Sequence, residues 1–164
     1  MTTKTPIVIL MADDDEDDIL LTQKALHQGK LLNKLYCVQD GEALLDYLFH
    51  RGAYTDAEKA PRPGVILLDL NMPKKDGREA LKEIKANPAV KDIPIVVFTT
   101  SKAEEDIYRS YKLGVNSFIT KPVTFERLVE VMQTLGKYWF EIVTLPSEEN
   151  KGAYKDTTNG RPAY

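Results

Sequence analysis

The chain alternates five times between a short apolar run and a segment whose apolar residues have helical spacing. The apolar runs lie at residues 6–12, 34–38, 64–69, 93–99 and 116–120. The helical segments lie at residues 16–29, 41–50, 77–86, 103–113 and 124–144. The first, third and fourth runs are apolar on both faces, which is typical of parallel strands covered by helices on both sides. The alternation therefore predicts an α/β fold with a five-stranded, parallel, doubly wound sheet.

Acidic residues gather where the first of these strands ends. Residues 13–18 read Asp-Asp-Asp-Glu-Asp-Asp, the third strand runs into Asp69, and the fourth ends at Thr99. Ligands of such sheets bind beyond the carboxyl ends of the strands, so Asp13, Asp14, Asp69 and Thr99 are expected to share one edge. Crowded carboxylates repel one another and either take up protons or hold a cation. This edge is the predicted site.

The acidic run divides into two groups. Glu16, Asp17 and Asp18 fall in the first turn of the following helix, where negative charge stabilises the helix dipole by about 0.3–1 kcal/mol. We interpret them as helix-start residues that face solvent. Asp13 and Asp14 differ because they leave the strand directly.

The predicted site offers oxygen ligands. Mg²⁺ prefers carboxylates, carbonyls, water and phosphate oxygens, and Asp13, Asp14, Asp69 and the main-chain carbonyl of Asn71 are the expected donors. No histidine or cysteine accompanies them, which argues against zinc and copper. Lys121 precedes a proline and should therefore stay extended, which lets its side chain reach the acids.

These groups suit a phosphoryl group carried on a carboxylate oxygen. Asp69 is the predicted nucleophile toward phosphorus, and Mg²⁺ and Lys121 are expected to neutralise the charge on the phosphoryl oxygens. The Thr99 hydroxyl is expected to donate a hydrogen bond to the phosphoryl group. The chain then acts only on itself and is not a turnover enzyme.

Size and composition exclude other classes. With 164 residues, the chain is expected to form one domain over residues 1–145 with a polar tail at 146–164. A net charge of −3 provides no basic surface for nucleic acid. Cys37 has no partner for a disulfide, no apolar stretch approaches the roughly 20 residues of a membrane span, and no secretory leader is visible. We expect a cytoplasmic protein that binds neither membrane nor nucleic acid.

The motifs at the strand ends resemble the receiver domain of bacterial response regulators. The similarity covers residues 5–142 and includes the pair Asp13-Asp14, then L-L-D-L-N-M-P-x-x-D-G around Asp69, V-V-F-T-T-S with Thr99, and S-F-I-T-K-P with Lys121. The resemblance implies a flavodoxin-like sheet with strand order 2-1-3-4-5 and a C-terminal extension after the fifth helix. It also implies that a phosphohistidine on a sensor histidine kinase donates the phosphoryl group to Asp69.

Further roles rest on the same resemblance. Thr99 and Phe118 would form a switch that changes the face made by the fourth helix, fifth strand and fifth helix. Asn71 and Ser101 match positions that tune the lifetime of the phosphoryl group, and Thr100 would modify its rate of formation or loss. The bond between Lys121 and the following proline is expected to be cis.

Finer similarity points to the regulators that pair with cyanobacterial phytochromes. The loop at 51–63, the segment 103–111 and the aromatic ending at 138–146 resemble that group. A homodimer through the switch face is expected, because a long fifth helix would carry apolar residues beyond the sheet. The alternative is that the C-terminal tail folds back over these residues. The candidate dimer residues are Ile107, Tyr111, Tyr138, Trp139, Phe140 and Ile142.

Other functions fit the residues less well. A receiver that serves as a phosphorelay intermediate or phosphate sink stays open as an alternative. A haloacid-dehalogenase-type phosphatase needs a second aspartate where the chain has Asn71. A flavin carrier would place its phosphate against the acidic run, and residues 146–164 are too short and too weakly basic for a DNA-binding module.

Overall fold

Five strands form one parallel sheet in the order β2-β1-β3-β4-β5. The computed structural model describes residues 6–140. The strands are β1 (Ile9–Ala12), β2 (Leu35–Val38), β3 (Val65–Leu68), β4 (Ile95–Thr99) and β5 (Ser117–Thr120). The helices are α1 (Glu16–Gln28), α2 (Gly41–Phe49), α3 (Gly77–Ala86), α4 (Glu104–Leu113) and α5 (Phe125–Leu135), with a 3₁₀ turn η1 (Gly52–Tyr54) and a π-helical turn η2 (Gly136–Phe140). The predicted fold class and strand order are confirmed.

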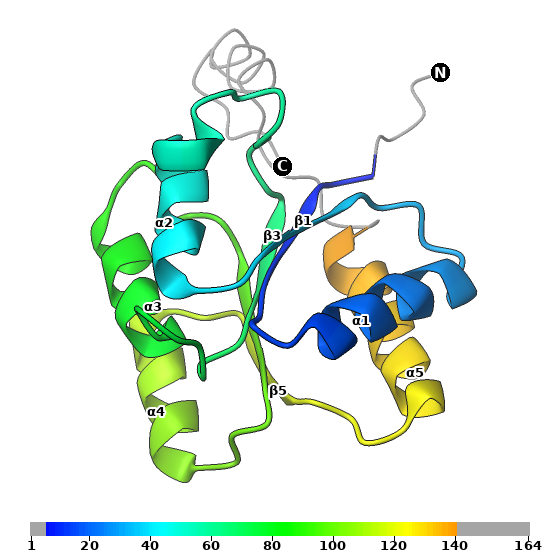
Figure 1. The fold of residues 1–164 in the computed structure, drawn as a ribbon. Coiled ribbons are helices and arrows are strands. Elements are labelled where there is room, and N and C mark those ends of the chain that lie inside the picture. Colours follow the sequence, from blue (N-terminus) through cyan, green and yellow to red (C-terminus); the bar gives the residue numbers. More distant parts are fainter. Residues whose placement is uncertain (1–5, 141–164) are drawn as a thin grey trace, which may run out of the picture.

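Helices cover both faces of the sheet, α1 and α5 on one side and α2, α3 and α4 on the other (Figure 1). Successive residues of a strand point to opposite faces. Ile9 and Met11 of β1 therefore pack with Met132 of α5, whereas Leu10 packs in the second core with Leu44 of α2. All residues of β1, β3 and β4 are buried. This two-sided core is the reason why their sequences read as continuous apolar runs.

Aspartates cap the first turns of α2 and α3. Asp40 Oδ1 accepts a hydrogen bond from the Ala43 N–H at 2.7 Å at the start of α2. Asp76 Oδ1 accepts from the N–H groups of Arg78 and Glu79 at 2.9 and 3.1 Å at the start of α3. These caps satisfy backbone donors that have no partner inside the helix.

The two glycines that follow α1 and α4 behave differently. Gly114 closes α4 with φ of +97°, the left-handed conformation that glycine adopts readily. Gly29 closes α1 with φ of −78°. Lys30 takes the positive φ of +60° there, because the chain turns one residue after the glycine.

The end of the fifth helix also differs from the prediction of a helix over 124–144. The α-helix ends at Leu135, and Gly136–Phe140 continues as one wider π-helical turn. Residues 141–144 and the predicted tail at 146–164 lie outside the described residues. None of the helices found between residues 6 and 140 is both long and apolar enough to cross a membrane.

Gly77 allows the start of α3 to lie against the end of β3. Its N–H donates to the Leu70 carbonyl at 2.9 Å. A Cβ at this position would lie 2.1 Å from the Asp69 carbonyl oxygen and 2.7 Å from the Leu70 Cα. Both are backbone atoms, which cannot move aside as a flexible side chain can.

We expect Gly77→Ala to lower the free energy of unfolding by about 1–3 kcal/mol, the usual cost of overpacking. Chemical denaturation measures this change. Gly29→Ala is the matched control, since its Cβ would meet the Gln133 Cγ at 3.1 Å with an ordinary φ. Equal stability of Gly77→Ala and the wild type would show that the contact between α3 and β3 is loose.

Candidate functional site

The parallel sheet brings the predicted residues together at the carboxyl ends of its strands. The hydrogen-bonding pattern of the sheet continues one residue past the ends of β1, β3 and β5. The Asp13 N–H donates to the Val38 carbonyl at 3.0 Å, the Asp69 N–H to the Ala12 carbonyl at 3.0 Å, and the Lys121 N–H to the Thr99 carbonyl at 2.8 Å. These bonds fix the backbone from which each side chain starts.

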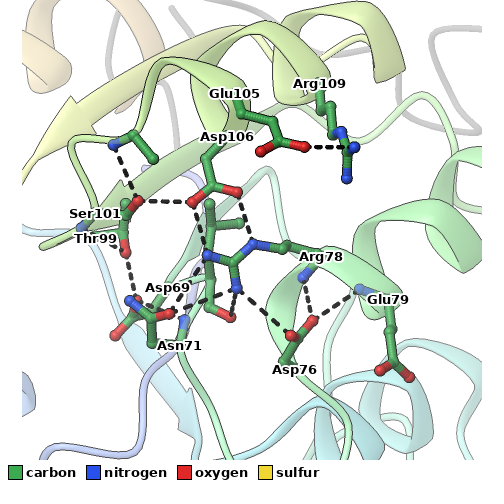
Figure 2. Close-up of polar contacts among 12 residues, drawn as sticks. Asp69, Asn71, Asp76, Arg78, Glu79, Thr99, Ser101, Glu105, Asp106 and Arg109 are labelled. Atoms are coloured by element: carbon green, nitrogen blue, oxygen red, sulfur yellow. Dashed lines mark hydrogen bonds and ion pairs between the residues drawn. The ribbon is translucent and has the colours of Figure 1, made fainter.

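Asp69 lies at the centre of the site and is only 5% exposed. Its Oδ1 accepts hydrogen bonds from the Thr99 hydroxyl at 2.8 Å and from the Asn71 N–H at 3.1 Å, and Figure 2 shows these neighbours. Its Oδ2 accepts one from the Lys121 ammonium at 3.0 Å. The two carboxylate oxygens therefore face different parts of the protein.

The Lys121 ammonium lies among three carboxylates. Its Nζ is 2.7 Å from Asp13 Oδ2, 2.8 Å from Asp18 Oδ2 and 3.0 Å from Asp69 Oδ2. Burial acts to lower the pKa of Lys121, but the surrounding carboxylates outweigh it and raise that pKa above its usual value. Lys121 therefore carries a positive charge at any physiological pH.

Asp18 is the residue that the sequence prediction misplaced. We interpreted it as a solvent-facing helix start, whereas it pairs with Lys121. Asp15 caps α1 by accepting from the N–H groups of Asp17 and Asp18, and the first turn then lies over the strand ends. The only sequence signal for this contact is that Asp18 lies in the first turn of the helix that follows β1.

The expected cis bond is also corrected. Among the described residues, no peptide bond is cis, so the bond between Lys121 and Pro122 is trans. Trans is the commoner isomer before proline by about 0.5–1 kcal/mol. The Lys121 side chain reaches the acids from this backbone.

Asp13, Asp14 and Asp69 could hold a cation. One carboxylate oxygen from each lies within 4.8 Å of the others, with Asp13 and Asp69 buried and Asp14 exposed. Asp13 Oδ2 is buried and accepts no hydrogen bond, because its contact with Lys121 is an ion pair outside hydrogen-bond geometry. This all-oxygen set with an unused buried acceptor fits a hard divalent ion. The Asn71 carbonyl remains a predicted ligand.

The remaining predicted residues surround this centre. The Ser101 N–H donates to Thr99 Oγ1 at 3.4 Å, and the Ser101 hydroxyl donates to Asp106 Oδ2 at 2.7 Å. Thr100 is exposed. Phe118 lies on β5, partly buried, and its N–H donates to the Tyr111 hydroxyl oxygen at 3.1 Å. The site thus extends from the acids toward α4 and β5.

Comparison with known proteins gives the family of this fold and site. The sequence profile of the response regulator receiver domain matches residues 9–133. The chain belongs to the response regulator receiver domain family. The observed strand order β2-β1-β3-β4-β5 is the one that the resemblance implied, so the predicted fold is confirmed.

Two response regulators, Rcp1 and RcpA, are similar to this receiver domain over most of its length. Rcp1 from Synechocystis sp. is 45% identical over 87% of this chain and 95% of its own. The structure of Rcp1 in its Mn²⁺-bound form has a TM-score of 0.77, with 87% of this chain and all of that chain covered. The phosphorylated cyanobacterial phytochrome response regulator RcpA is 42% identical with a TM-score of 0.79 and the same coverage.

A third relative comes from an archaeal methanogen. The probable methanogenesis regulatory protein FilR2 from Methanothrix harundinacea is 36% identical over 82% of this chain and 84% of its own. Similarity at this level therefore extends beyond phytochrome regulators.

Without a divalent ion, this receiver domain should lose stability as the pH rises from about 4 to about 6. Burial raises the pKa of Asp13 to about 6, against the lowering effect of Lys121. In this interval the folded protein therefore binds a proton that the unfolded chain has released, which makes unfolding harder at the lower pH. The free energy of unfolding should fall by roughly 2 kcal/mol between pH 4 and pH 6.

Denaturation in chelator at several pH values measures this loss. Asp13→Asn should be more stable than the wild type at pH 7 and should lack this part of the pH dependence. Asp17→Asn, at an exposed position in the same acidic run, is the control and should keep the wild-type profile. A wild-type stability that increases between pH 4 and 6 would contradict the raised pKa.

Proposed function

We propose that this receiver domain accepts a phosphoryl group on Asp69 from a phosphohistidine of a sensor histidine kinase, with Mg²⁺ bound beside it. The arrangement of Asp69 carries the proposal. This buried carboxylate has an ammonium on one oxygen, a threonine hydroxyl on the other, and a cluster of acids within 4.8 Å. Membership of the receiver family and the phosphorylated structure of RcpA support it.

The chemical step needs a nucleophile and neutralisation of charge. An Asp69 carboxylate oxygen attacks phosphorus, the P–N bond to the donor imidazole breaks, and the imidazole leaves with the bonding electron pair. The Lys121 ammonium neutralises charge on the phosphoryl oxygens, and the Thr99 hydroxyl turns to donate a hydrogen bond to one of them. When bound, Mg²⁺ supplies further positive charge at those oxygens.

Asp13, Asp14 and Asp69 are the side chains that would hold the ion. Their oxygens lie close enough to share one cation, and Asp13 Oδ2 is an unused acceptor. Mg²⁺ prefers this kind of ligand and usually keeps several waters. The protein is a signalling switch in this proposal, since it catalyses only its own phosphorylation and dephosphorylation.

The output surface is the face of α4, β5 and α5. Thr99 leaves Asp69 for the phosphoryl group, and Phe118 repacks on β5 next to it. The Tyr111 hydroxyl oxygen of α4 accepts a hydrogen bond from the Phe118 N–H of β5. A movement of Phe118 would therefore also move α4. Partners that bind this face would detect the phosphorylated state.

A bacterial phytochrome is the proposed sensor kinase, and a homodimer is the proposed assembly. Similarity to Rcp1 and RcpA supports the first. Exposed aromatic side chains support the second, since Tyr111 of α4 is 50% and Tyr138 of the turn after α5 is 63% exposed, and Ile107 of α4 is half-buried. The side chains of Trp139 and Phe140 and all of Ile142 lie outside the described residues.

Incubation with acetyl phosphate and Mg²⁺ should add one hydroxylamine-labile phosphoryl group at Asp69. Intact mass and peptide mapping measure this modification. Asp69→Asn should remain unmodified because an amide cannot form the acyl phosphate. Asp13→Asn and Asp14→Asn should weaken Mg²⁺ binding by removing a charged ligand, whereas Asp17→Asn should not. Labelling of Asp69→Asn to the wild-type level would show that another residue is the acceptor.

Light scattering at micromolar concentration tests the assembly. We expect a dimer in at least one phosphorylation state, and Tyr138→Glu should weaken it at least about tenfold because a carboxylate would be buried without a partner. Ala53→Glu is the control, because Ala53 is exposed on η1, which contacts α2 near the β2 edge of the sheet, whereas β5 forms the opposite edge. A wild type that is monomeric both with and without phosphorylation would refute the dimer and favour the phosphorelay role.

A further inference from the structure

An ion pair joins the first turns of α3 and α4 beside the site. Arg78 Nε donates to Asp106 Oδ1 and Arg78 Nη2 to Asp106 Oδ2, both at 2.7 Å. Figure 2 shows the guanidinium of Arg78 directed at this carboxylate. The hydrogen bonds from Arg78 lower the pKa of Asp106 to about 2. A bidentate, charge-assisted pair of this kind fixes orientation as well as distance.

The pair reaches Asp69 through the loop that follows β4. Asp106 Oδ2 also accepts the Ser101 hydroxyl at 2.7 Å. The Ser101 N–H donates to Thr99 Oγ1 at 3.4 Å, and that hydroxyl donates to Asp69 Oδ1 at 2.8 Å. A continuous series of hydrogen bonds therefore runs from the acceptor carboxylate to the first turn of α4.

Arg78 also contacts the loop that follows β3. Its Nη1 donates to the Leu70 carbonyl at 3.4 Å, and both Nη atoms lie 3.5 Å from the Asn71 side-chain oxygen. One guanidinium thus contacts the loop after β3 directly and the loop after β4 through Asp106 and Ser101. Arg78 and Asp106 could not be predicted from the sequence, because neither follows a strand directly.

A purely structural role would be the simplest explanation for this pair. A second ion pair on the same helix shows what that role looks like. Arg109 and Glu105 pair one turn apart on α4, both about two-thirds exposed, and they contact neither loop. Asp106, in contrast, has a side chain only 13% exposed and contacts Ser101 as well as Arg78. The Arg78–Asp106 pair therefore has contacts that packing α3 against α4 does not need.

We propose that Arg78 and Asp106 are positioning residues that hold Ser101, and with it Thr99, in the arrangement of the unphosphorylated protein. The inference rests on the proposed function, in which Thr99 leaves Asp69 to bond the phosphoryl group. Ser101 shares a hydrogen bond with Thr99, so the loop must move with it. The Asp106 carboxylate, fixed by Arg78, resists that movement.

Loss of the pair should therefore favour the phosphorylated arrangement. A contact made only in the unliganded state lowers the affinity for any ligand that requires the other state. Without the pair, a phosphoryl group or a mimic of it should bind more tightly. The affinity for Mg²⁺ alone should stay the same, because Asp13, Asp14 and Asp69 are not touched.

Titration calorimetry with beryllofluoride in saturating Mg²⁺ tests the proposal, because this phosphoryl mimic binds without being hydrolysed. Arg78→Ala and Asp106→Ala should each bind it about fivefold more tightly than the wild type, a modest effect because Arg78 is partly exposed. The double variant should bind no more tightly than either single variant, since both remove the same contact.

Arg109→Ala is the matched control and should bind as the wild type does. Mg²⁺ titration of every variant shows whether the acidic site is intact. A folding defect would weaken Mg²⁺ binding and can therefore be distinguished from a change in the switch. If the wild type binds no beryllofluoride, both the proposed function and this inference are wrong. If the wild type binds it but the single variants bind it equally or more weakly, only this inference is wrong.

Discussion

Repulsion among carboxylates at one edge of the sheet is the interaction around which the site is built. Asp13, Asp18 and Asp69 all contact the ammonium of Lys121, and Asp14 lies beside them. Four carboxylates and one ammonium leave a net negative charge in a partly buried space. Burial raises the pKa of Asp13 to about 6, and the negative charge of Asp69 adds a smaller part. A divalent cation would offset the negative charge, and the proposed phosphoryl transfer would use the same cation, so the unfavourable charge and the proposed chemistry are connected.

The buried core holds the backbones of the acidic residues in place despite the repulsion between their charges. The strands that carry Asp13, Asp69 and Thr99 are buried on both faces between two helical layers. Their backbones are further held by hydrogen bonds that continue past the strand ends. Gly77 brings the start of α3 against the Asp69 backbone. The carboxylates therefore cannot separate to relieve their repulsion without breaking the sheet.

Residues directly after strands could be predicted from the sequence, because the parallel alternation fixes which edge each strand end occupies. Asp13, Asp14, Asp69, Thr99 and Lys121 lie together for this reason. Asp18 could not be placed, since its contact depends on how the first turn of α1 lies over that edge.

The pairing of Arg78 with Asp106 depends in the same way on the packing of two helices. Local sequence patterns carry no information about such contacts. Gly29 does follow the last residue of α1, but its φ is negative. The end of α5 was placed wrongly, because the π-helical turn at Gly136–Phe140 follows the α-helix there.

The two oxygens of Asp69 separate the site into halves with different tasks. Oδ2 faces Lys121, which also holds the acids of β1 and α1. Oδ1 faces Thr99, from which the hydrogen bonds lead through Ser101 and Asp106 to α4. In the proposed function, a phosphoryl group on Asp69 would change both halves, but they would respond differently. The acidic half would gain a ligand for its cation and could stay in place, whereas the Thr99 half would lose its acceptor and have to rearrange. The proposed signal would therefore be directed toward α4 and β5 instead of α1.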